Sequence, residues 1–243
     1  MFDGKLIKLT EQRKKALRQQ AMFPLIFFSV MTIVTLCTIL PLSRVKSVTV
    51  TSPDKQVRVA VIKASGLHYY ESLFAIWWRA DQIENTIQKK VGVVDNANIR
   101  YKNVNNVVID IKEEPLVGYA YRNGKYYKVG SSGRALTEGT TNVNDSYPVF
   151  YNFKNNEKLR LAVTTIKKLP NELKKSISEI HYDPSKVNPD RVKLYMNDGN
   201  EVIGDLKTLK NKLGYYPQIT TKMKQKGVVD LEVGAFSYPK NKN

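Results

Sequence analysis

The hydrophobic pattern is dominated by one apolar run, Met22 to Leu42, which contains no charged residue. At about 1.5 Å per residue, a helix of this length reaches ~31 Å, close to the ~30 Å hydrocarbon core of a bilayer. Because a backbone in hydrocarbon must satisfy its own hydrogen bonds, the run is expected to be helical, with Pro24 in its first turn and Pro41 at its exit. The pattern predicts a transmembrane helix over residues 22–42.

Basic residues are concentrated just before this run. The first 21 residues contain six Lys or Arg and two acidic residues, whereas Arg44 and Lys46 are the basic residues that immediately follow the run. The positive-inside bias therefore predicts a cytoplasmic tail over residues 1–21 and places the chain from Ser43 onward outside the membrane.

A cleaved signal peptide is the main alternative to an anchor, since it would also begin basic and become apolar. The run is longer than the ~7–15 residues of a signal h-region, and no small-x-small cleavage site follows Leu40. A helix buried in a soluble core is disfavoured because the run is apolar on every face and the rest of the chain offers no comparable partner.

After the anchor, the periodicities predict a first module over residues 44–115 with the order strand, helix, helix, strand, strand. The expected strands are 44–50, 93–101 and 107–111, and the expected helices are 56–65 and 79–90. Gly66 suits the left-handed position that ends the first helix. Residues 67–78 form a connector rich in large apolar side chains, and Pro115 ends the module.

The pattern then changes to a second module with strands and helices mixed, so the overall fold class is α+β. Asn123-Gly124 and Asp198-Gly199 predict tight hairpin turns, and Pro170 ends an amphipathic helix. The expected strands are 119–122, 125–129, 149–153, 177–182, 191–196, 201–203 and 228–233, and the expected helices are 157–169 and 206–213, the latter interrupted by Pro217. The predicted boundaries are 116–235 for this module and 236–243 for a flexible tail.

Charge and cysteine usage narrow the possible partners. The formal charge is +17, which would draw the exported part toward anionic wall polymers or lipid headgroups; a solvated basic surface is the plainer alternative. Nucleic acid is disfavoured because the cations outside the tail are scattered and the region is exported. The single cysteine, Cys37, lies in the anchor, so no disulfide is expected outside, a habit common in Gram-positive bacteria.

Residues suited to catalysis are sparse. His68 and His181 lie in different modules, so a zinc site is not expected, and His181 is interpreted as a structural histidine. Residues 130–133 lack the G-x-S-x-G spacing and are interpreted as a turn. Glu113 and Glu114 point to opposite faces of an extended segment and cannot act as a pair. We predict no catalytic, cofactor-binding or metal-binding residue.

The exposed or buried state of Trp77 and Trp78 stays open. The two rings could fill the core around the connector, contact the outer leaflet of the membrane, or contact an apolar surface of a partner.

The strand-helix-helix-strand-strand order behind a membrane anchor resembles a POTRA domain, and its details resemble the FtsQ/DivIB family of bacterial division proteins. The resemblance is carried by RVKSVTV at 44–50, ESLF at 71–74, ANIRY at 97–101 and VVIDIKEEPLVGY at 107–119. Thr51-Ser52-Pro53 stands where the family usually has a Gly. In the second module, Gly204-Asp205 and Val229-Asp230-Leu231 resemble the end of the family's β domain.

The resemblance implies a non-enzymatic, bitopic membrane scaffold of the divisome at the septum. It would bind the single-pass proteins FtsL and DivIC, or FtsB in Gram-negative bacteria, outside the membrane and help regulate septal peptidoglycan synthesis. A basic surface protein that binds anionic wall polymers or lipid headgroups is the alternative. The resemblance also places the partner site on the last helix and strand, which in this sequence are Tyr215, Tyr216, Val229, Asp230, Leu231 and Glu232.

Alternation within the last expected strand supports this placement. It puts Val229, Leu231 and Val233 on one face and polar Asp230 and Glu232 on the other. As the last strand in the chain, it is expected at a sheet edge, where an extended segment of a partner could pair with it.

Overall fold

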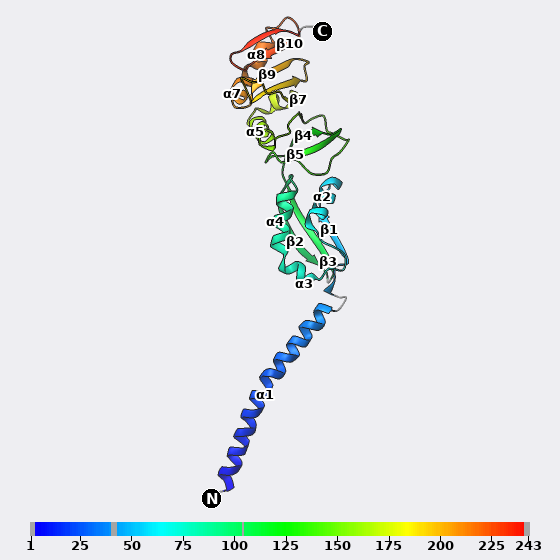
Figure 1. Ribbon diagram of the computed structural model, residues 1–243, viewed down its shortest axis with the longest axis vertical. Coiled ribbons are helices and arrows are strands. Elements are labelled where there is room, and N and C mark those ends of the chain that lie inside the picture. The colour runs from blue at the N-terminus through cyan, green and yellow to red at the C-terminus, as the bar shows by residue number, and fades with distance from the viewer. Residues whose placement is uncertain (1–2, 40–42, 104, 241–243) are drawn as a thin grey trace. The chain divides into compact units, whose positions relative to one another are not determined.

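The computed structural model describes residues 3–39, 43–103 and 105–240, without the side chains of residues 3–16, 19 and 37–39. The chain divides into two compact units. Figure 1 labels the helices and strands along the chain. One unit comprises Met1–Val48, His68–Arg79 and Tyr101–Val107, and the other comprises Thr49–Leu67, Ala80–Arg100 and Val108–Asn243.

Helix α1 extends over Asp3–Ile39, so it continues through both the basic tail and most of the apolar run. Pro24 lies inside this helix, and its prediction as a first-turn residue is wrong. The reason is that the preceding segment is rich in Lys, Arg, Gln, Ala and Leu, which propagate a helix readily. Pro41 and the end of the predicted span at Leu42 lie outside the described residues.

The apolar side chains of α1 from Met22 to Leu36 are exposed. Among the residues that the structure describes, no helix has both the length and the apolar character that crossing a membrane requires.

The first module has the predicted order, with an additional short helix in the connector. Its elements are β1 (Ser47–Thr51), α2 (Lys55–Ser65), α3 (Leu73–Trp78), α4 (Ala80–Lys90), β2 (Val94–Lys102) and β3 (Asn106–Glu113), and its sheet has the order β1-β3-β2. Helix α2 begins where the Asp54 carboxylate accepts from the Gln56 N–H at 2.9 Å, and it ends at Gly66, whose φ is 63°. The core side chains of this part include Val57, Val61, Ile83, Ile87 and Ile109.

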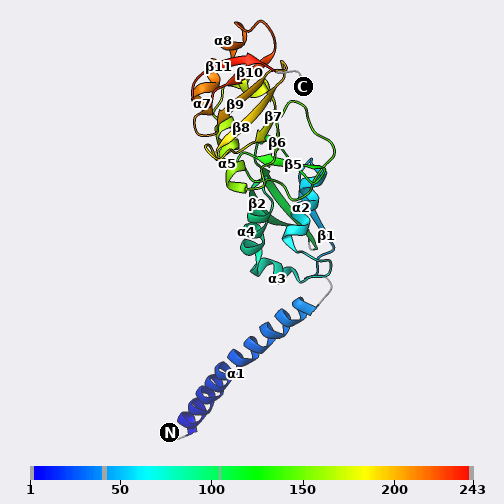
Figure 2. The same ribbon diagram turned by 45° about the horizontal axis from the view of Figure 1, so that its top comes forward.

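The second module is built on an eight-stranded mixed sheet with the order β11-β10-β9-β8-β7-β6-β4-β5 (Figure 2). The strands are β4 (Leu116–Arg122), β5 (Lys125–Gly130), β6 (Val149–Tyr151), β7 (Ile177–Tyr182), β8 (Arg191–Met196), β9 (Glu201–Asp205), β10 (Gly227–Asp230) and β11 (Phe236–Pro239). The pairs β4–β6, β6–β7 and β9–β10 are parallel, and the remaining pairs are antiparallel.

Helices pack their apolar residues against this sheet. They are α5 (Asn156–Lys167), α6 (Asn171–Lys175), α7 (Leu209–Lys212), the 3-10 turn η2 (Leu213–Tyr215) and α8 (Tyr216–Thr220). The Asn155 side chain accepts from the Glu157 N–H at 2.7 Å and fixes the start of α5. Pro217 lies in the first turn of α8 instead of interrupting a helix, because a proline there loses no intrahelical hydrogen bond.

Both predicted hairpin turns are confirmed. Asn123 and Gly124 have φ values of 50° and 76°, the two positive values that a two-residue turn requires between β4 and β5. Gly199 has φ 88° between β8 and β9, and the Asp198 side chain accepts from the Asn200 N–H at 3.0 Å.

The C-terminal part differs from its prediction. The strand expected over 228–233 ends at Asp230, whose side chain accepts from the Glu232 N–H at 2.9 Å and turns the chain. Residues 236–239, expected to be frayed, form β11 and pair with β10, so β10 is not the edge of the sheet. Residues 241–243 of that expected tail lie outside the description.

Candidate functional site

His181 and its neighbour Tyr151 are engaged in structural contacts, whereas the side chain of His68 is exposed. His181 stacks on the ring of Tyr151 with centroids 4.5 Å apart, and its Nε2 lies 2.6 Å from the Glu179 carboxylate. Burial, and then the hydrogen bond with Tyr126, raise the pKa of Tyr151 to about 12, so this phenol stays protonated at neutral pH. No group of three or more metal-binding side chains occurs among the described residues.

The two adjacent glutamates bind different partners, as their opposite directions predict. Glu113 accepts from the Ser52 hydroxyl at 2.6 Å, whereas Glu114 accepts from the Ser132 N–H at 2.7 Å and lies 3.3 Å from Arg134. Gly133 has φ 76° and its N–H donates to the Gly130 carbonyl, so residues 130–133 form a turn, not a nucleophile elbow.

The six residues expected to bind a partner differ in accessibility. Tyr215 is exposed, Asp230 and Glu232 are half-buried, and Tyr216, Val229 and Leu231 are core residues. Only the first three can therefore touch a partner directly without a change in the module, while the other three hold the surface in place. Val233, expected on the buried face, is 90% exposed because the strand has already ended.

Tyr216 links α8 to the β8–β9 turn. Its hydroxyl lies 2.7 and 2.9 Å from the two carboxylate oxygens of Asp198. Burial, and then this hydrogen bond, raise the pKa of Tyr216 well above its usual value. Burial also raises the pKa of Asp198, but the Asn200 N–H and the Tyr216 hydroxyl outweigh it, and the net pKa is below its usual range. The contact therefore joins a buried phenol of α8 to an exposed carboxylate of the β8–β9 turn, next to the exposed Tyr215.

Strand β11 provides the exposed edge that the sequence predicted for β10. The Leu231 N–H donates to the Ile203 carbonyl of β9 at 2.8 Å, so alternation directs the Asp230 N–H toward β11. Asp230 pairs with Phe236 and Val228 pairs with Tyr238 in the register of β10 and β11. The backbone N–H and C=O groups of Phe236 and Tyr238 therefore point toward β10, and those of Ser237 point outward. Pro239 falls at the next outward position, where its missing N–H costs the ladder nothing.

A shallow cavity of about 490 Å³ adjoins this edge. It is lined by Lys222, Met223, Lys224, Gln225, Ser237, Tyr238 and Pro239. Sequence reasoning missed β11, although the alternation of Phe236 and Tyr238 after Gly234 was a readable signal for a short strand. The edge and the cavity together can offer main-chain hydrogen bonds and one recess for a side chain.

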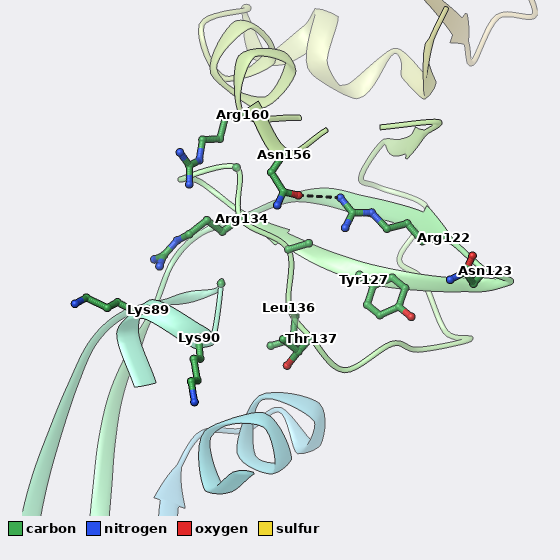
Figure 3. A pocket seen from close by; sticks show the side chains of 13 residues that line it. Lys89, Lys90, Arg122, Asn123, Tyr127, Arg134, Leu136, Thr137, Asn156 and Arg160 are labelled. Atoms are coloured by element: carbon green, nitrogen blue, oxygen red, sulfur yellow. Dashed lines mark hydrogen bonds between the residues drawn. The ribbon is translucent and has the colours of Figure 1, made fainter. Parts of the chain in front are cut away.

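A second, basic pocket of about 520 Å³ lies between the end of α4, the β4–β5 hairpin and the start of α5 (Figure 3). Its cationic lining residues are Lys89, Lys90, Arg122, Arg134 and Arg160, and no acidic residue lines it. Arg122 is directed at Asn156, and Arg134 is held by the Gln88 carbonyl at 2.5 Å. Lys89, Lys90 and Arg160 form no salt bridge with any described residue.

The arrangement defines a class: a small β-α-α-β-β module followed by a mixed-sheet module that presents a free strand edge. Residues 42–114 match the POTRA domain, FtsQ-type, and residues 118–232 match the family described as cell division protein FtsQ/DivIB, C-terminal. The chain belongs to the FtsQ/DivIB family of cell division proteins.

Curated relatives cover nearly the whole chain. The cell division protein DivIB of Ligilactobacillus salivarius is 40% identical over 100% of this chain and 85% of its own length. DivIB of Enterococcus faecalis is 36% identical over 99% of this chain, and the match spans 64% of that relative's length. DivIB of Listeria monocytogenes is 34% identical over 97% of this chain and 87% of its own length. The solved major extracytoplasmic domain of DivIB from Geobacillus stearothermophilus is 30% identical, covers 46% of this chain and 99% of its own, and has a TM-score of 0.41.

Proposed function

We propose that this cell division protein is a non-enzymatic, single-pass scaffold of the bacterial divisome. Residues 22–42 cross the membrane, residues 1–21 lie in the cytoplasm, and both modules lie outside at the septum. There the protein binds FtsL- and DivIC/FtsB-type single-pass proteins and helps regulate septal peptidoglycan synthesis. Family membership supports the division role, and the uncharged run flanked by a basic tail supports the topology.

The partner docks on the C-terminal end of the second module. The outward backbone of Ser237 on β11 is the observation that carries this proposal, because an unpaired strand edge accepts an extended segment by main-chain hydrogen bonding. Tyr215 and the half-buried Asp230 and Glu232 are the accessible members of the expected site; buried Tyr216, Val229 and Leu231 support them. The neighbouring cavity supplies side-chain specificity.

The decisive variant is Ser237→Pro, made in the full chain and tested by pull-down of a DivIC-type partner from detergent-solubilised membranes. It deletes an outward N–H that the protein's own sheet does not use, so circular dichroism and melting should stay unchanged. Loss of one interchain hydrogen bond, about 1 kcal/mol, should weaken the partner about fivefold, and the proline ring should weaken it further.

Two further variants serve as controls. Ser237→Ala keeps the N–H and should bind as the parent protein does. Asp230→Pro, harmless if β10 were the edge, should lower the melting temperature because the Asp230 N–H faces β11. A folded Ser237→Pro protein that binds the partner with unchanged affinity would rule out pairing at β11.

A second function is favoured by the basic pocket: binding of an anionic wall polymer outside the membrane. Three of its cations, Lys89, Lys90 and Arg160, are exposed and have no described acidic partner to neutralise them. A polymer of phosphodiesters would bring the counter-charge that the lining lacks.

We would test this with the double variant Lys89→Gln/Arg160→Gln, measuring retention on immobilised poly(glycerol phosphate) during a salt gradient. Elution should shift to lower salt than for the control Lys222→Gln/Lys224→Gln, which removes the same charge elsewhere on the second module. Equal shifts for both variants would mean that net charge alone, not this pocket, binds the polymer.

A further inference from the structure

Helix α3 presents an unusually apolar face to solvent. Phe74, Trp77 and Trp78 are 57%, 60% and 75% exposed, whereas Ile76 on the opposite face is fully buried. The rings of Phe74 and Trp77 lie 5.8 Å apart, and those of Trp77 and Trp78 lie 6.5 Å apart, so they form one aromatic cluster. Core filling, one of the roles left open for the tryptophans, is therefore excluded.

Backbone pairing ties this helix to the residues that follow the predicted membrane span. Arg44 forms an antiparallel bridge with Ser72, the residue directly before α3. The Val45 N–H donates to the Glu71 carbonyl at 3.0 Å, and the Tyr70 N–H donates to the Val45 carbonyl at 2.9 Å. Arg44 lies two residues beyond Leu42, and two extended residues reach at most ~7 Å. Wherever the chain leaves the membrane, α3 must start nearby.

The surroundings of the bridge carry positive charge. Arg44 and Lys46 are exposed. The β2–β3 turn holds both, since the Asn105 side chain donates to the Arg44 carbonyl and the Lys46 N–H donates to the Asn105 carbonyl, each at 2.8 Å. Glu71, the acidic residue of this region, already pairs with Arg79. Arg44 and Lys46 form no salt bridge with another described residue, and exposed cations beside exposed aromatic rings match the phosphates and the interfacial layer of a lipid surface.

We propose that α3 is an interfacial membrane contact: Phe74, Trp77 and Trp78 insert among the outer-leaflet headgroups while Arg44 and Lys46 meet lipid phosphates. This rests on the proposed single-pass anchor. Indole rings favour that layer because they combine a large apolar area with one polar N–H. The contact gives the first module a second attachment to the membrane and restricts its rotation about the anchor.

The chain itself supplies the probe, because Trp77 and Trp78 are its two tryptophans. Intrinsic tryptophan emission therefore reports on α3 alone. We would reconstitute the full chain in liposomes containing phosphatidylglycerol, with bromine atoms on the lipid acyl chains at either a shallow or a deep position. The proposal expects emission shifted to shorter wavelength, with greater loss of emission from shallow bromines than from deep ones. The single variants Trp77→Phe and Trp78→Phe should each retain this pattern.

Flotation after an alkaline wash separates failure of the anchor from failure of α3. Protein that does not float with the liposomes would refute the anchor. Protein that floats, but whose emission is insensitive to bromine and fully quenched by aqueous acrylamide, would overturn the α3 contact while leaving the anchor intact. Protection from acrylamide that develops only when a DivIC-type protein is co-reconstituted would assign the aromatic face to a partner and also overturn the lipid contact.

Discussion

Asp190 is the most strongly buried carboxylate of the described chain, with 1% of its surface exposed. Its two oxygens lie 2.5 Å from the Lys158 amino group and 2.6 Å from that of Lys207, and its carbonyl accepts from the Leu206 N–H at 3.0 Å. The Asp190 carboxylate thereby links Lys158 of α5 to Lys207 in the segment that follows β9. Hydrogen bonds from Lys158, and then Lys207, hold the pKa of Asp190 below its usual value.

Asp190→Asn should therefore destabilise the second module by about 2 kcal/mol at pH 7, because two charge-assisted hydrogen bonds are weakened. Urea unfolding followed by circular dichroism would measure it. The matched control is Asp183→Asn, whose pair with Arg191 is more exposed and should contribute less than ~1 kcal/mol. Equal losses for the two variants would show that burial of the Asp190 pair adds nothing.

The same variant gives a prediction for pH. A carboxylate with a depressed folded-state pKa contributes stability above its unfolded-state pKa of ~3.9 and loses it as the pH falls through the folded-state value. The difference in unfolding free energy between the parent and Asp190→Asn should thus be constant from pH 7 to about 5 and shrink below about pH 4. A difference that instead shrinks between pH 7 and 5 would assign the effect to another group.

At the scale of elements, helices and turns were predictable where the sequence contains a capping residue, a helix-ending glycine or a tight-turn pair. Asp54 and Gly66 mark both ends of α2, and Asn123-Gly124 marks the β4–β5 hairpin. Helix α3 carried no such signal: Ser72 precedes it without a side-chain cap, and its periodicity is too short to read over six residues. Only its packing, with Ile76 inward and the tryptophans outward, defines it.

The order of strands within the sheet was harder to predict than the position of each strand in the sequence. Alternation located β10 and placed Val229 and Leu231 in the core, but which strand lies beside β10 depends on pairing between distant segments. A last strand in the chain is not necessarily an edge. The turn after Asp230 and four further residues were enough to add β11, and with it the edge moved to Ser237.

The candidate site was consequently predicted only in outline. The family resemblance pointed to the C-terminal end of the second module, and the partner site there stays a prediction. Burial separates accessible Tyr215 from its core neighbour Tyr216. Adjacent residues in the 3-10 and α-helical turns around position 216 face different directions, which sequence order alone does not reveal. Tyr216→Ala would mainly remove a core ring and the bond to Asp198, so Tyr215→Ala is the cleaner probe of docking.

At the scale of the whole molecule, positive charge lies both in the segment before the apolar run and on the surface of the modules. The formal charge of +17 includes a basic tail before the apolar run, and the remaining cations are spread over the modules. Close to the run, the basic residues of the tail outnumber Arg44 and Lys46, and the proposed orientation of a single span rests on this difference. Farther away, cations such as Lys89 and Arg160 are exposed, as the proposed binding of an anionic polymer requires.

The topology can be tested directly on intact protoplasts of cells that carry the protein with an epitope at each end. Added protease should digest the part after Leu42 and leave an epitope on residues 1–21 protected, because the proposed topology places the tail inside. Replacing Lys5, Lys8, Lys14 and Lys15 by Gln removes most of the charge bias, so a fraction of the molecules should invert and protect the C-terminal epitope instead. Matching replacement of Lys222 and Lys224, far from the run, should leave the orientation unchanged.

The opposite result would be a parent protein whose modules resist protease until the protoplasts are lysed, which would place the modules in the cytoplasm. Two proposals would then be untenable: the docking of extracellular partners at β11, and the contact of α3 with the outer leaflet.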